Sequence, residues 1–95
     1  MTLRDSYKAK IEAQIEEETA RIAMLKARAK RLAADAQILS MEELAETEAK
    51  LEALKGKLGR YLGAGEGAFE DLKHGVELAS RNLAQAVRHA AKRFD

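Results

Sequence analysis

The sequence predicts an all-α protein in which one long coiled-coil helix leads through a glycine joint into a shorter amphipathic helix. Three observations support this prediction. The 95-residue chain is rich in Ala, Glu, Lys, Leu and Arg, a composition typical of long helices. It contains no Pro, no Trp, two Tyr and two Phe, and this scarcity of aromatic residues disfavours a β-sheet protein. Its apolar residues recur at steps of three and four positions, which is helical spacing.

The long helix is expected over residues 3–62. This stretch has no Pro, and its only glycines, Gly56 and Gly59, lie near its end. A continuous helix of this length would extend about 90 Å and could not bury its own apolar seam. We therefore expect the seam to form an interface between copies of the chain, in an antiparallel oligomeric bundle. Its residues are Ile15, Ile22, Leu25, Leu32, Leu44, Leu51, Leu54 and Leu58.

A break in this helix is the alternative. The apolar phase slips by one residue between Leu39 and Leu44, and Ser40 followed by Glu43 fits a capping box. Such a break would give a monomeric three-helix bundle with a turn near Ser40. Positions 37–42 contain no Gly, Pro, Asn or Asp to build a turn, and this favours the continuous helix.

Charge blocks along the helix suggest how it pairs. A basic block at 21–31 matches an acidic block at 42–52, and acidic residues at 16–18 match basic residues at 55–60. Both matches share a pivot near residue 37, so a hairpin and an antiparallel dimer of long helices would each satisfy them. Charges of mixed sign on an ordinary solvated face would also account for the pattern.

The joint is expected at 63–67, because five of the six glycines lie between 56 and 67. The following helix, over about 66–94, carries its apolar residues on one stripe: Phe69, Leu72, Val76, Leu83, Val87 and Phe94. Acidic residues fill its first half and basic residues its second, which suits the helix dipole. Burial of the stripe in a bundle is expected, and contact with a membrane surface is the alternative. The whole chain, 1–95, then forms a single helical unit.

The run from Ala64 to Glu77 resembles the hallmark of a family of small, uncharacterised bacterial coiled-coil proteins, some of which are labelled stress-associated. The chain departs from the family pattern at Phe69 and Ser80, where the family has Trp, and at Gly67, where it has an acid. The resemblance implies a helical protein without known catalysis, and it carries over no site residues.

No arrangement of residues points to catalysis, a metal or a cofactor. The two histidines, His74 and His89, stand fifteen positions apart on one helix without convergent carboxylates, and the chain has no Cys. A net charge of +1 disfavours a nucleic-acid binder, although the basic block at 21–31 could meet phosphates.

No apolar run reaches the ~18 residues of a membrane span, and the polar N-terminus lacks an export signal, so the cytoplasm is expected. We therefore expect a non-enzymatic structural or interaction protein that binds itself, an unknown protein partner or a membrane surface.

Overall fold

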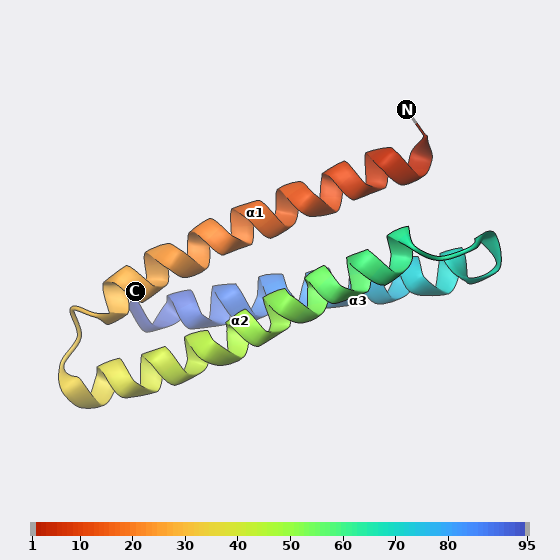
Figure 1. The fold of residues 1–95 in the computed structure, drawn as a ribbon. Helices are drawn as coiled ribbons and strands as arrows, with labels where there is room; N and C mark the ends of the chain where they lie inside the picture. Colours follow the sequence, from red (N-terminus) through yellow and green to blue (C-terminus); the bar gives the residue numbers. More distant parts are fainter. Residues whose placement is uncertain (1, 95) are drawn as a thin grey trace.

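Three helices packed side by side make up the fold (Figure 1). The computed structural model describes residues 2–94. Its elements are α1 (Leu3–Ala29), α2 (Ala34–Leu62), the short 3-10 helix η1 (Glu66–Ala68), α3 (Phe69–Ala91) and a final 3-10 turn η2 (Lys92–Phe94). α1 and α3 run in the same direction and α2 runs against both, in a bundle of 51 × 21 × 17 Å. The all-α prediction is confirmed at this level.

The prediction of one continuous helix over 3–62, paired with a second copy in an antiparallel rod, was wrong. The chain turns at residues 30–33, where the Arg31 N–H donates to Arg28 O and the Leu32 N–H donates to Ala29 O, each at 3.1 Å. The alternative of a three-helix bundle is confirmed as an architecture, but its turn near Ser40 is in the wrong place. Ser40 lies inside α2, and only 1% of its surface is exposed.

Tertiary packing explains a turn that carries no glycine or proline. Breaking the helix gives up a few backbone hydrogen bonds, each with a net value of about 1 kcal/mol. Folding back buries residues such as Leu25 and Leu44, and each fully buried leucine contributes roughly 1.5–3 kcal/mol. The burial gained along the whole seam therefore outweighs the bonds lost at the turn.

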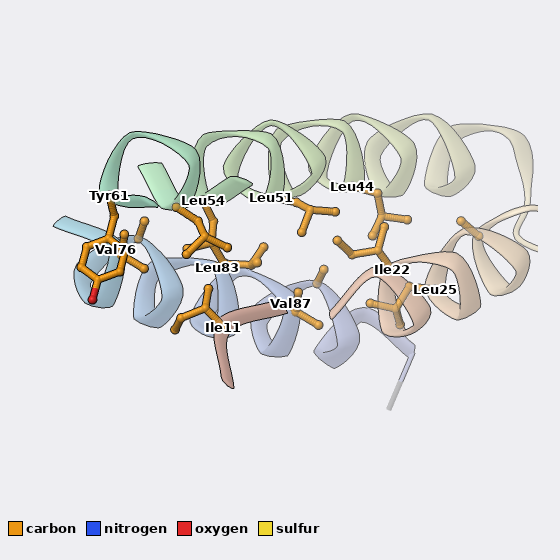
Figure 2. Close-up of a cluster of buried hydrophobic side chains, with 14 residues drawn as sticks. Ile11, Ile22, Leu25, Leu44, Leu51, Leu54, Tyr61, Val76, Leu83 and Val87 are labelled. Carbon is orange, nitrogen blue, oxygen red and sulfur yellow. The ribbon is translucent and has the colours of Figure 1, made fainter. Parts of the chain in front are cut away.

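One core runs along the axis of the bundle (Figure 2). All three helices contribute to it at heptad-like positions: Ile11, Ile22, Leu25 and Ala29 from α1, Leu44, Leu51, Leu54, Leu58 and Tyr61 from α2, and Val76, Ala79, Leu83, Val87 and Ala90 from α3. The residues predicted to form an interface between chains thus pack within one chain: Ile22, Leu25, Leu44, Leu51, Leu54 and Leu58. The other two, Ile15 and Leu32, are half-buried.

Of the two predicted pairings of charge blocks, the structure shows one within the hairpin, whereas Glu17, Glu18 and Lys55 form ion pairs inside their own helices. Lys26 Nζ on α1 lies 2.7 Å from Glu48 Oε1 on α2, which joins the basic block at 21–31 to the acidic block at 42–52. Both side chains are a little over a third exposed, so the pair specifies how the helices align more than it stabilises them.

The glycine joint is packed against the N-terminal turn of α1. α2 ends at Leu62, and the Gly63 N–H donates to Gly59 O at 3.1 Å. Arg4 donates from Nη2 to Ala64 O at 3.3 Å, and its guanidinium carbon lies 4.6 Å from the centre of the Phe69 ring. These contacts hold the joint in place and fix where α3 begins.

The predicted amphipathic helix over 66–94 is divided into η1, α3 and η2, and its stripe faces the other two helices. Val76, Leu83 and Val87 are buried. The three remaining stripe residues, Phe69, Leu72 and Phe94, are partly buried against the same core.

Candidate interaction surface

An open apolar groove runs between α1 and α2, and α3 contributes no residue to it. Its volume is about 720 Å³. The floor is formed by Ile15 of α1 and by Leu58 and Leu62 of α2. The remaining lining residues are small or charged: Glu12, Glu16, Thr19, Ala20, Ala23, Lys55 and Gly59. A fourth helix laid here would cover apolar side chains that one chain leaves open to solvent.

The groove exists because α1 and α2 carry apolar or small residues on two faces. On α1 the heptad positions, such as Ile11 and Ile22, point into the core. The neighbouring helical face carries Ile15 and the exposed alanines Ala20 and Ala23. Helices with apolar residues on more than one face are usually covered on more than one face.

The charges of the groove are separated by helix. Glu12 and Glu16 stand on the α1 wall, while Lys55 stands on the α2 wall and donates to Glu52 Oε1 at 3.2 Å. Nearer the α1–α2 turn the signs reverse, since Lys26 belongs to α1 and Glu48 to α2. The groove itself therefore has acidic residues on its α1 wall and a basic residue on its α2 wall, and the Lys26–Glu48 pair lies outside it.

A second groove, between α2 and α3, is polar and has a volume of about 510 Å³. At its end Glu43 accepts a hydrogen bond from Arg93 Nε, and its Oε1 lies 3.8 Å from His89 Nε2. His89 is 78% exposed, so water competes strongly for this contact. Among residues 2–94 no group of three His, Asp or Glu side chains could hold a metal ion. The cluster is best explained as an ion pair that ties η2 to α2.

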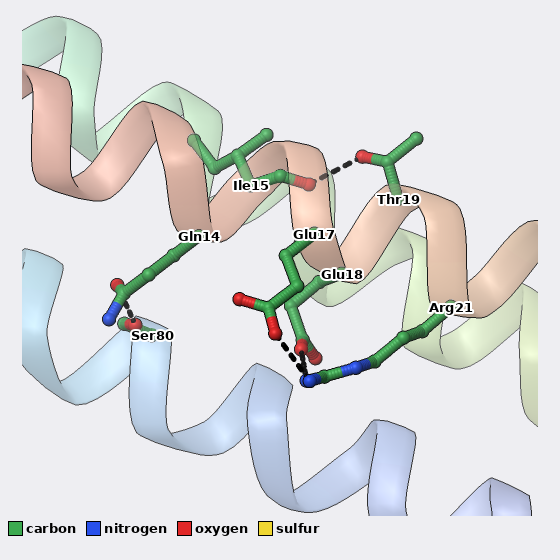
Figure 3. A network of polar contacts seen from close by, with 7 residues as sticks. All are labelled: Gln14, Ile15, Glu17, Glu18, Thr19, Arg21 and Ser80. Carbon is green, nitrogen blue, oxygen red and sulfur yellow. Dashed lines mark hydrogen bonds and ion pairs between the residues drawn. The ribbon is translucent and has the colours of Figure 1, made fainter.

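Polar contacts also fix α1 against α3 (Figure 3). Ser80 Oγ donates to Gln14 Oε1 at 2.8 Å. Glu18 is buried, with only 6% of its surface exposed. It accepts a hydrogen bond from Arg21, which also forms an ion pair with Glu17. The bond between Ser80 and Gln14 connects α1 to α3, whereas the contacts of Arg21 with the two glutamates lie within α1.

The predicted site residues thus fall into two groups. Ile15 and Leu58 line the open groove, and the other interface and stripe residues belong to the core or pack against it, apart from Leu32 in the turn. Sequence reasoning missed the alanines and Gly59 of the groove. The alanines of α1 outside its heptad positions gave only a weak signal, because alanine suits any face of a helix and just two of the five line the groove: Ala9, Ala13, Ala20, Ala23 and Ala27.

No protein-family model, curated protein or solved structure matches this chain. Within the part of the chain that the structure describes, no helix is both long and apolar enough to cross a membrane. Function therefore has to be inferred from the surface of the bundle.

Proposed function

We propose that this chain is a non-enzymatic structural protein that acts by associating with further copies of itself. The open apolar groove between α1 and α2 carries this proposal. Burying apolar surface is the dominant driving force of protein association, and this groove offers apolar side chains that α3 leaves uncovered.

Two further observations support a structural role. The ion pairs of the described residues either join helices, as at Lys26 and Glu48, or lie within one helix, as at Lys55 and Glu52, which is typical of structural contacts. The resemblance of the run from Ala64 to Glu77 to small helical proteins without known catalysis, some labelled stress-associated, agrees with this role. A stress-linked setting in the cytoplasm is part of the proposal, and cell fractionation before and after stress would test it.

Association through the groove is favoured over membrane binding through α3. The apolar stripe of α3 packs in the core, with Val76 and Leu83 fully buried. A membrane surface would have to compete with that core and pull α3 out of the bundle, whereas the groove is open without any rearrangement.

Sedimentation velocity over a range from micromolar to near-millimolar chain concentration tests the proposal. We expect the mass to rise from the 10.5 kDa of one chain to a multiple of it as concentration increases. A mass of one chain at every concentration would contradict self-association. Co-sedimentation with anionic vesicles at low salt, in that case, would decide for the membrane alternative.

A further inference from the structure

We infer that the α1–α2 groove is filled by the same groove of a second copy, with α1 of each copy lying on α2 of the other. This inference rests on the proposed self-association and assigns it a surface and a geometry. The pair has a two-fold axis parallel to the helices, so the two copies point in the same direction.

The rotation about this axis keeps every residue at its level along the bundle. It carries α1 across to face the partner's α2, and the two helices run in opposite directions, as α1 and α2 do within one chain. The four central helices then form a bundle in which each helix is antiparallel to both neighbours, a common and stable arrangement.

Charge complementarity selects this geometry. Glu12, Glu16 and Lys55 line the same groove, and in the register set by the Lys26–Glu48 pair Lys55 lies about one helical turn from Glu16 and about two turns from Glu12. In the two-fold pair, the acidic α1 wall of one copy faces Lys55 on the α2 wall of the other, and symmetry repeats the contact. An axis running across the helices would lay α1 on α1, and the two glutamates would meet no Lys55.

The lining of the groove suits a closely packed helix. Ala20, Ala23 and Gly59 add little bulk above the helix backbones, so an approaching helix can come near. Ile15 and Leu62, which are half-buried within one chain, supply the larger apolar side chains that such a helix would cover.

A matched pair of substitutions tests the surface. Ala23 and Ala49 are both exposed alanines inside helices, but only Ala23 lines the groove. Ala23→Glu is expected to sediment as a single chain with unchanged helical circular dichroism, whereas Ala49→Glu is expected to associate like the unmodified chain. If Ala23→Glu associates as strongly as Ala49→Glu, the groove is not the interface and the inference is overturned.

A mixing experiment tests the geometry. The double variant Glu12→Lys/Glu16→Lys and the variant Lys55→Glu each place like charges at both contacts of their own dimer. We expect each to raise the dimer dissociation constant about tenfold or more, since it replaces attraction by repulsion at two exposed contacts. In an equimolar mixture opposite charges meet at both contacts, so a mixed dimer with the affinity of the unmodified chain is expected.

The outcomes separate the geometry from the proposed function. If the mixture is as weak as its components, or if either charge variant associates normally alone, the two-fold geometry is wrong while self-association stands. A single-chain mass for the unmodified protein at all concentrations would overturn both.

Discussion

Tyr7 shows how single residues connect the three helices. Its hydroxyl donates to Lys73 O on α3 at 3.4 Å, and its ring centre lies 5.0 Å from that of Tyr61 on α2. Burial and, to a smaller extent, the negative charge of Glu77 together raise the pKa of Tyr7 to about 12. The folded state therefore favours the neutral phenol.

Alkaline pH is expected to weaken the fold through this residue. In the unfolded chain Tyr7 loses its proton near its ordinary pKa of 10.0, but in the folded chain it keeps the proton to about pH 12. Its contribution is therefore complete below pH 10 and is lost as the pH rises towards 12. Urea unfolding at a series of pH values should show a shallower alkaline loss of stability in Tyr7→Phe. Equal slopes in the two proteins would contradict this assignment.

Among the elements, α3 contains one residue that weakens it without a structural reason. Gly75 lies in the helix interior, and a Cβ added there would meet no atom within 4 Å. Glycine in such a position costs about 1 kcal/mol relative to alanine, because it loses more backbone freedom on folding. Gly75→Ala is therefore expected to raise the free energy of unfolding by roughly 1 kcal/mol.

Denaturant unfolding monitored by circular dichroism measures this effect, and Gly56→Ala in α2, where the added Cβ also meets open space, is a matched comparison. We expect both variants to shift the midpoint upwards by similar amounts. A loss of stability in Gly75→Ala alone would mean that α3 packs more closely against its neighbours than the structure shows.

The elements also show which parts of the fold sequence reasoning could reach. The end of α2 and the start of α3 were predictable, because glycines at 63, 65 and 67 break a helix by their own backbone properties. The turn at 30–33 was not, because its residues are ordinary helix formers and burial of distant residues decides it. The groove was missed for a related reason. An alanine such as Ala23 suits a helix on any face, and only the packed structure shows that it lines a surface.

At the scale of the whole molecule, the ion pair between Lys26 and Glu48 can be used to tell a hairpin from an exchange of helices between chains. The two arrangements differ in whether both residues belong to the same chain. The pair spans α1 and α2 of one chain at 2.7 Å. A long-helix dimer that crosses near residue 37 would make the same pairing between two chains, because the charge blocks are symmetric about that position. Whether the pairing lies within or between chains is therefore a direct test of the three-helix fold.

Zero-length carbodiimide cross-linking makes this test, because it joins an amine to a carboxylate in contact with loss of one water. An equal mixture of unlabelled and isotope-labelled chains, unfolded together and refolded, is cross-linked at the lowest concentration that gives a detectable product, where association through the groove is weakest. We expect the peptide joining Lys26 to Glu48 to be wholly light or wholly heavy, and Glu48→Gln to abolish it. Peptides of mixed label would mean that α1 packs on the α2 of another chain. The turn at 30–33 would then be a hinge between chains, and the core would be shared by two copies.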